Sequence, residues 1–179
     1  MAARIFHEQG YEAASLQEIA DEVGLLKGSL YYYIKTKEDL LWRIVMRPHV
    51  AAMALVEECS TMEASPAERL SWFITAYANM LAKDKIFVTV YLSELDRLSP
   101  DRLKIIRRER DRFITFMVDL IEEGQRSGAF RAGGNAEVLA LAILGMLNAS
   151  ARWYGARRPH SPETVIESIL LLVSSGIIL

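Results

Sequence analysis

Helix-start signals constrain the fold of this chain more than any other feature. Ser15–Glu18 and Ser65–Glu68 match the capping box, in which the serine hydroxyl and the acidic side chain each accept a hydrogen bond from a backbone N–H that the helix leaves unpaired. Thr36–Asp39 is a close variant, and Ser99–Pro100 and Ser161–Pro162 place proline where its missing N–H costs nothing. Strand signals, such as sustained alternation or hairpin turns, are almost absent. The sequence therefore predicts an all-α protein.

Length and composition narrow the class further. The chain has 179 residues, 51% of them hydrophobic, which is enough for one sizeable core or for a small domain joined to a larger one. The longest apolar run, Val138–Leu147, has ten residues, about half of the roughly 20 that a membrane span needs. A single cysteine, Cys59, fits a reducing compartment. We expect a cytoplasmic protein with no membrane contact, and the net charge of −2 requires any nucleic-acid site to be a local patch.

Apolar periodicity divides the chain into a small domain, residues 1–47, and a larger one, residues 48–179. Pro48 is expected to kink or break the long helix around it, because proline removes one backbone hydrogen bond and crowds the preceding turn. The helices are expected over residues 2–9, 15–23, 27–34, 37–62, 66–83, 85–98, 101–126, 136–154 and 163–178. The last two are apolar on most faces, which favours burial in a subunit interface.

The segment Ser15–Lys37 has the pattern of two short helices joined by a tight turn at Gly24. Its inward face is expected to consist of Leu16, Ile19, Ala20, Val23, Leu30 and Tyr33. Because three consecutive tyrosines cannot all face one side of a helix, Tyr31 and Tyr32 are expected to point outward. Three lysines and no acidic residue lie between Lys27 and Lys37. This combination favours a helix-turn-helix that enters a DNA major groove.

The same segment resembles the TetR family of bacterial repressors. The likeness covers about 35 residues, from Gly10 to Ile44, and continues more loosely as an all-helical layout. The residues that carry it are Ile19-Ala20, Val23-Gly24, Lys27-Gly28-Ser29-Leu30-Tyr31, Tyr33-Ile34 and Thr36-Lys37-Glu38 with Leu40. The resemblance implies a helix-turn-helix DNA-binding domain followed by a helical bundle that binds an effector and forms the dimer.

The resemblance also implies roles for individual residues. Ser15 and Gln17 would touch the DNA backbone or bases, and Lys27, Gly28 and Ser29 the bases, whereas Tyr31, Tyr32 and Lys37 would mainly touch phosphates. Two departures are expected to weaken binding. Position 26 is leucine where a polar cap such as serine is usual, and the chain begins inside the family's first helix, without its arginine-bearing start and basic arm.

A ligand site is expected among aromatic and polar residues of the larger domain, since effector pockets are mostly apolar with a few polar groups. The candidates are Trp72, Tyr77, Phe87, Tyr91, Phe116, Asn148, Arg152 and Trp153. Arg152-Trp153-Tyr154 followed by Arg157-Arg158-Pro159 resembles a segment of TetR-family members that sense acyl-CoA thioesters. The alternatives are that the aromatic residues belong to the core and that the arginines belong to a solvated loop.

Catalytic and metal-binding patterns were not found in the sequence. His7, His49 and His160 lie far apart and match no metal-ligand spacing, and no phosphate-binding glycine loop or nucleophile elbow is present. We therefore expect no enzyme activity, no catalytic residues, no metal and no cofactor.

Taken together, these patterns predict a homodimeric, ligand-responsive repressor of double-stranded DNA. The last two helices of each subunit would form a four-helix interface, and the symmetric dimer would require a palindromic operator with half-sites about one DNA turn, roughly 34–36 Å, or somewhat more apart. Effector binding among helices 66–126 and 136–154 would tilt helix 37–62 and change that spacing. The alternative is a helical small-molecule carrier or scaffold with a vestigial DNA module.

Overall fold

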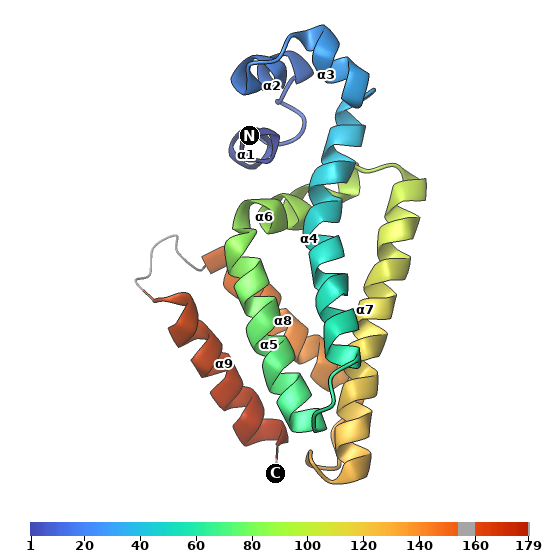
Figure 1. Cartoon of the computed structure of the whole chain (residues 1–179), viewed down its shortest axis with the longest axis vertical. Coiled ribbons are helices and arrows are strands. Elements are labelled where there is room, and N and C mark those ends of the chain that lie inside the picture. Colours follow the sequence, from blue (N-terminus) through green and yellow to red (C-terminus); the bar gives the residue numbers. More distant parts are fainter. Residues whose placement is uncertain (154–159, 179) are drawn as a thin grey trace. The chain divides into compact units, whose positions relative to one another are not determined.

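The computed structural model describes residues 1–153 and 160–178, with the side chains of residues 27, 152 and 153 outside the description. Over this part of the chain the fold is all-α, as predicted, apart from a single β-bridge between Phe130 and Ile178 (Figure 1). The helices are α1 (Ala2–Gln9), α2 (Leu16–Val23), α3 (Lys27–Tyr33), α4 (Lys37–Ser60), α5 (Pro66–Lys83), α6 (Lys85–Glu94), the 3₁₀ helix η1 (Leu95–Arg97), α7 (Pro100–Ser127), α8 (Ala136–Trp153) and α9 (Pro162–Ile177).

The helix starts follow the local chemistry expected from the sequence. The backbone N–H of Glu18 donates to Ser15 Oγ at 3.1 Å, and that of Thr164 donates to Ser161 Oγ at 3.3 Å. Complete capping boxes are formed by Ser65 with Glu68 and by Thr36 with Asp39, since in each pair both backbone N–H groups are bound by the other residue's side chain. Asn135 caps α8 in the same way, accepting from Val138 N at 3.0 Å.

The chain forms two compact units. The first consists of Met1–Val50 and Asp84–Ile106, and the second of Ala51–Lys83 and Arg107–Leu179. The continuous helices α4 and α7 therefore each contribute residues to both units.

The first unit is built on a core to which α1, α2, α3, the first half of α4, α6 and the start of α7 all contribute. Phe6, Ile19 and Leu41 are almost fully buried in it, and Val90 and Ile106 join them from the second sequence segment. Figure 1 shows α2 and α3 at one end of this unit, with α1 between them and α6. Residues 84–106 thus complete the core on which the two short helices are mounted.

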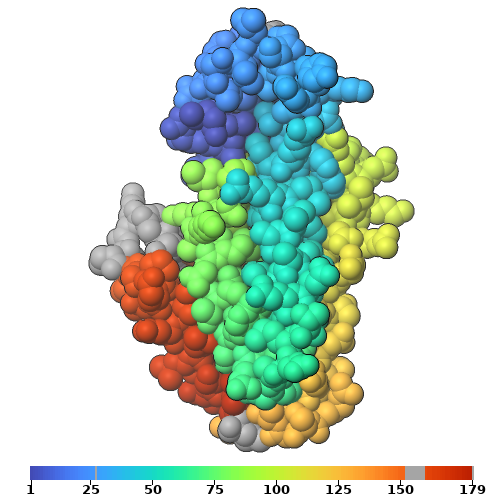
Figure 2. All heavy atoms as spheres, in the orientation of Figure 1, coloured from blue at the N-terminus to red at the C-terminus, as the bar shows by residue number. Residues whose placement is uncertain are grey.

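The second unit is held by mutual packing of α5, α8 and α9, to which α7 adds aromatic residues. In Figure 2 α9 (red) lies along α5 (green). Near the end of α7 a Cβ at Gly124 would lie 2.0 Å from the Phe130 ring, so only glycine lets this buried ring close the end of the unit. Arg69 of α5 binds Glu123 of α7 at 2.8 Å.

Three expectations need correction. Pro48 lies within the unbroken helix α4, so the expected break is absent. Val23, expected inside, is 46% exposed, because the chain turns at Gly24 and leaves the last turn of α2 at the edge of the unit. Tyr33, also expected inside, is 63% exposed. The helix ends at Tyr33, and the extended residue Ile34 occupies the inward position in its place.

No helix in the described ranges is long and apolar enough to cross a membrane.

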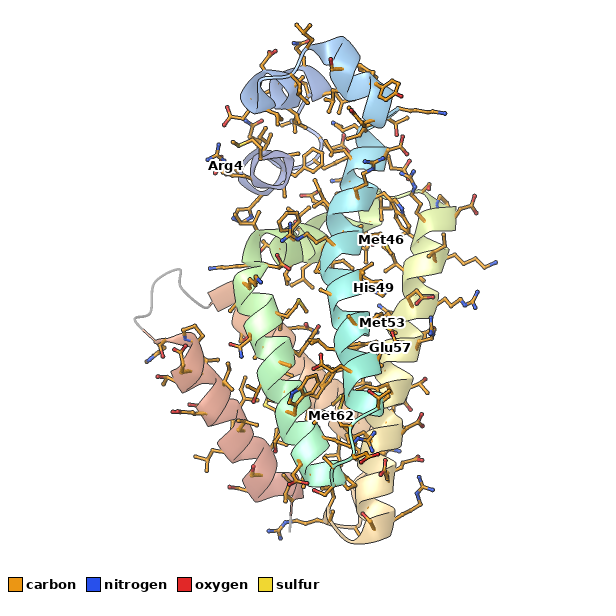
Figure 3. All side chains as sticks on the ribbon, viewed as in Figure 1. Arg4, Met46, His49, Met53, Glu57 and Met62 are labelled. Atoms are coloured by element: carbon orange, nitrogen blue, oxygen red, sulfur yellow. The ribbon has the colours of Figure 1, made fainter. Side chains whose placement is uncertain are left out.

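Along α4, Met46, His49, Met53 and Glu57 follow one another at spacings of three and four, which places them on one face of the helix (Figure 3). Arg4 extends from α1 in the same view and forms an ion pair with Glu22 at 2.5 Å.

Candidate nucleic-acid interface

The turn between α2 and α3 is shaped by Gly24. This residue has φ 71° and ψ 26°, the left-handed conformation in which a side chain is strained. The N–H of Leu25 donates to Ala20 O at 2.9 Å, and that of Gly24 to Asp21 O at 3.1 Å, which closes the end of α2. The next residue but one, Leu26, already begins the N-terminus of α3. The two short helices are therefore joined by the tight turn that the sequence predicted.

Helix α3 is anchored by one face and leaves the others open. Leu30 and Ile34 are each only 6% exposed and hold the helix to the core. Gly28, Ser29 and Tyr31 are exposed, and Tyr32 is 85% exposed, as predicted for the two outward tyrosines. The rings of Tyr32 and Tyr33 meet edge to face with centroids 5.1 Å apart. The backbone of residue 27 belongs to α3, but the Lys27 side chain lies outside the described residues.

The start of α3 lacks a polar cap. Leu26 occupies the N-cap position with φ −63° and ψ 140°, its side chain makes no capping hydrogen bond, and it is 81% exposed. The departure noted in the sequence therefore has the expected local effect: the first amide groups of α3 have no side-chain acceptor. The N–H of Ser29 donates instead to the backbone oxygen of Leu26 at 2.9 Å.

The predicted contacts of α2 are partly engaged within the protein. Ser15 Oγ accepts the cap hydrogen bond from Glu18 N, and Gln17 Nε2 donates to Asp21 Oδ1 at 2.8 Å along the helix. Both residues remain exposed. Either side chain can still reach a neighbouring molecule, although Gln17 must first give up or share its amide hydrogen bond.

The two lysines that follow α3 differ sharply. Lys35 is exposed. Lys37, the first residue of α4, is half-buried, and its ammonium donates to the backbone oxygens of Tyr11, Glu12 and Ala14 at 2.8, 3.1 and 2.9 Å. The same nitrogen lies 4.5 Å from the centroid of the Tyr11 ring.

Two arginines that the sequence interpretation did not assign also hold this region. Arg43 Nη2 donates to Tyr33 O, the last carbonyl of α3, at 3.0 Å. Arg102, at the start of α7, hydrogen-bonds Asp39 and lies 3.3 Å from Glu38 in the first turn of α4, with its guanidinium 5.5 Å from the Trp42 ring centroid. Neither contact has a local sequence signal, because the partners lie ten or more residues away.

The pKa values of the two carboxylates beside Arg102 are lowered by their surroundings. The pKa of Glu38 is lowered chiefly by hydrogen bonds from Ser99, whose backbone N–H donates to it at 2.9 Å, and less by Arg102. The pKa of Asp39 is lowered chiefly by its hydrogen bond with Arg102 and also by the Thr36 capping box. Both carboxylates therefore stay charged in the folded protein at pH values where the free side chains would begin to protonate.

The predicted ligand residues separate into two groups. In the second unit, Tyr77 donates its hydroxyl hydrogen bond to Asn148 Oδ1 at 2.9 Å, and Phe73 links Tyr77 to Phe116 with ring centroids 5.8 and 5.1 Å away. Trp72 lies on the same helix as Tyr77 and is half-buried.

Phe87 and Tyr91 are instead half-buried and pack against the core of the first unit, and the Arg47 guanidinium lies 4.1 Å from the Phe87 ring centroid. Residues 152 and 153 end α8, and the side chains of Arg152 and Trp153 lie outside the described residues, as do Tyr154, Arg157 and Arg158.

The exposed helix α3, mounted on a buried leucine and preceded by a glycine turn, defines a helix-turn-helix DNA-binding protein. Residues 1–44 match the family model described as bacterial regulatory proteins, tetR family, and residues 63–177 match the tetracyclin repressor-like C-terminal domain. The chain belongs to the TetR family of transcriptional regulators, as its helix-turn-helix sequence predicted.

Known proteins align with nearly the whole chain. The TetR family transcriptional regulator PfmR from Thermus thermophilus is 30% identical, with a TM-score of 0.89 over 98% of this chain and 95% of its own. The ketosteroid transcriptional regulator KstR2 of Mycobacterium tuberculosis is 27% identical, with a TM-score of 0.90 over 99% of this chain and 91% of its own. The fatty acid metabolism regulator protein of Bacillus subtilis strain 168 is 24% identical over 98% of this chain and 91% of its own.

Proposed function

We propose that this regulator is a homodimeric repressor that leaves a palindromic operator when an acyl-CoA-type or other small apolar effector binds. The observation that supports the DNA part is the exposure of Gly28, Ser29, Tyr31 and Tyr32 on α3, while Leu30 and the following Ile34 are buried. A helix held in this way presents its N-terminal residues to base edges, while flanking groups bind phosphates.

The proposed DNA contacts follow from position on the two short helices. Lys27, Gly28 and Ser29 face the base edges, because glycine permits close approach and the other two carry hydrogen-bonding groups. Tyr31, Tyr32 and the exposed Lys35 bind phosphates, and Ser15 and Gln17 meet the backbone or bases from the start of α2. In this proposal residues 1–47 bind DNA, and residues 48–179 bind the effector and form the dimer. The whole protein acts in the cytoplasm and catalyses no reaction.

The dimer is proposed to form through α8 and α9. Val138 and Leu141 on α8 and Leu171 and Leu172 on α9 are exposed in the single chain, and a Cβ at Gly145 would meet nothing within 4 Å. Large apolar residues that recur on one face of neighbouring helices are typical of subunit interfaces. A self-complementary pairing of these faces would produce the two-fold symmetry that a palindromic operator matches.

The effector is proposed to bind in the second unit, near Tyr77, Phe116 and Asn148. These residues combine aromatic surface with one hydrogen-bonded polar pair, which suits an acyl chain with a single polar anchor. The names of two relatives, a ketosteroid regulator and a fatty acid metabolism regulator, support an apolar effector. Arg152, Arg157 and Arg158 supply positive charge for the phosphates of coenzyme A.

Residues 84–106 are proposed to transmit effector binding to the DNA-binding helices. They belong in sequence to the proposed effector part, yet they complete the core on which α2 and α3 are mounted. An effector that shifts this segment would change how the two short helices are held.

Fluorescence anisotropy with the full-length protein tests this function. An operator is first selected from random duplexes, and its affinity is then measured with palmitoyl-CoA, with free coenzyme A and with palmitate as comparison ligands. We expect palmitoyl-CoA to weaken operator binding at least about fivefold, the lower end of ordinary allosteric coupling. Binding of palmitoyl-CoA without a change in operator affinity would refute the switch, and the absence of sequence-selective binding would refute the DNA function.

A further inference from the structure

The ammonium of Lys37 is saturated within the protein. An ammonium group has three N–H donors, and here three backbone oxygens accept from it at 2.8 to 3.1 Å. The nitrogen also lies 4.5 Å from the centroid of the Tyr11 ring, whose face attracts a cation. A phosphate could be bound only if one of these contacts were broken.

The three acceptors belong to one short segment. Tyr11, Glu12 and Ala14 lie between α1 and α2, 23 to 26 residues before Lys37, and their carbonyl groups converge on one point. The segment is itself anchored, because Ala14 is buried and the Tyr11 ring meets Phe6 at a centroid distance of 5.5 Å. Without a cation at that point, converging carbonyl dipoles would repel one another and lose their hydrogen-bond partner.

The segment leads directly into the DNA-binding helices. Ala14 is followed by Ser15, the N-cap of α2, and Lys37 begins the helix that follows α3. The lysine therefore fixes the start of α2 against the start of α4, and both short helices lie in the chain between these two points. At the far end of α3, Arg43 binds the Tyr33 carbonyl and adds a second attachment to α4.

We propose that Lys37 is a positioning residue, which sets the orientation of α2 and α3 for sequence-selective binding, and that it contributes no phosphate contact. This differs from the role that the family resemblance implied for it. The inference rests on the proposed DNA-binding function. The neighbouring Lys35, exposed and only two residues away, provides the phosphate contact and thus a matched control.

The test compares Lys37→Met, Lys37→Arg and Lys35→Met in the full-length protein. Affinity is measured for the selected operator and for a random duplex between about 50 and 200 mM salt. Lys35→Met should lower the magnitude of the salt slope by about 1.8 on both duplexes, which is about 0.9 for the phosphate contact of each subunit. Lys37→Met should leave the salt slope unchanged, weaken operator binding by roughly tenfold and weaken random-duplex binding far less.

Lys37→Arg separates position from charge. A phosphate contact would survive this change, because arginine keeps the positive charge and binds phosphate well. The flat guanidinium cannot direct three donors from one nitrogen to three converging carbonyls. We therefore expect Lys37→Arg to lose selectivity between operator and random duplex about as much as Lys37→Met does.

A stability control excludes a trivial loss of folded protein. Ile74→Val removes one buried methyl group in the second unit and should lower Tm by about 2–5 °C. Measured well below Tm, this variant should keep the operator-to-random affinity ratio, whereas Lys37→Met should not.

Any of three results would overturn the inference: a drop of about 1.8 in the salt slope for Lys37→Met, as one lost phosphate contact in each subunit would give, rescue by Lys37→Arg, or an unchanged affinity ratio in Lys37→Met. Failure of the unmodified protein to bind any duplex selectively would overturn the proposed DNA-binding function. If the unmodified protein binds selectively and one of the three results is found, only the inference about Lys37 fails.

Discussion

Replacing Arg102 by methionine should destabilise the first unit measurably. The change keeps much of the apolar stem but removes the guanidinium, which binds Asp39 and Glu38 and lies 5.5 Å from the Trp42 ring centroid. The Arg102 side chain is 25% exposed, and the two carboxylates are 29% and 30% exposed. The interaction is therefore less exposed than a surface ion pair and more exposed than a fully buried one.

The expected magnitude follows from that position. Exposed pairs contribute about 0.2–1 kcal/mol, whereas removing one partner of a buried pair costs about 3–5 kcal/mol. For a group three-quarters covered we expect a loss of about 2 kcal/mol, or a fall in Tm of about 4–8 °C. Arg97→Met is the control, because Arg97 binds Glu12 at 3.2 Å while both side chains are more than half exposed. It should cost less than about 0.5 kcal/mol.

The pH dependence provides a second test of the same reasoning. Folding lowers the pKa of both carboxylates, so the unfolded chain binds more protons near their ordinary pKa values. The stabilisation is fully present above the unfolded pKa values, about 3.9 for Asp and 4.3 for Glu, and is lost as pH falls through the lower folded values. The cost of Arg102→Met should therefore be full at pH 7 and shrink below about pH 4.

Urea denaturation of the unmodified protein and of Arg102→Met at pH 7, 5 and 3.5 measures the loss of stability and its dependence on pH. In Arg102→Met the pKa of Asp39 should rise more than that of Glu38, because Arg102 is the first cause of the lowered pKa of Asp39. Glu38 keeps its hydrogen bond from Ser99. An equal loss at pH 3.5 and pH 7 would contradict the electrostatic explanation. A loss at pH 7 no larger than that of Arg97→Met would show that the contact contributes nothing beyond a surface pair.

Three further predictions concern single side chains. Leu26→Ser should stabilise the protein by about 1 kcal/mol, because it supplies the missing cap of α3, whereas Leu26→Ala should not; equal melting temperatures for the two variants would contradict this. Leu171→Glu should convert the proposed dimer to monomer by placing charge in the apolar face of α9, as sedimentation velocity would show, and an unchanged sedimentation coefficient would place the interface elsewhere. Tyr77→Phe should cost about 1–2 kcal/mol in urea denaturation because it removes the donor to Asn148, and a loss within error of zero would show that this hydrogen bond contributes little.

Much of this architecture could be predicted because the decisive signals are local. The caps at Ser15, Thr36, Ser65 and Ser161 act on residues three positions away, so their chemistry is visible in four letters of sequence. The same holds for the turn at Gly24. The helix-turn-helix and its family were therefore predicted correctly before any tertiary contact was known.

The errors occurred where helix periodicity was extended past a helix end. Tyr33 lies three residues after the buried Leu30, so a continuing helix would turn it inward. The chain instead becomes extended at Ile34, which takes the buried position. Pro48 does not break α4, which continues through it as one helix, and the proline is itself buried.

The sequence by itself determined the all-α class, the helix starts and the helix-turn-helix segment, because each depends on residues within a turn or two of one another. Only the tertiary structure decided how that segment is held. Lys37 reaches carbonyls 23 to 26 residues earlier, and Arg102 reaches Asp39 across 63 residues. Ion pairs and converging carbonyl groups of this kind depend on distances in space, so no local sequence pattern predicts them. Lys37 therefore resembles a phosphate ligand in sequence, but in the folded protein its ammonium binds backbone oxygens.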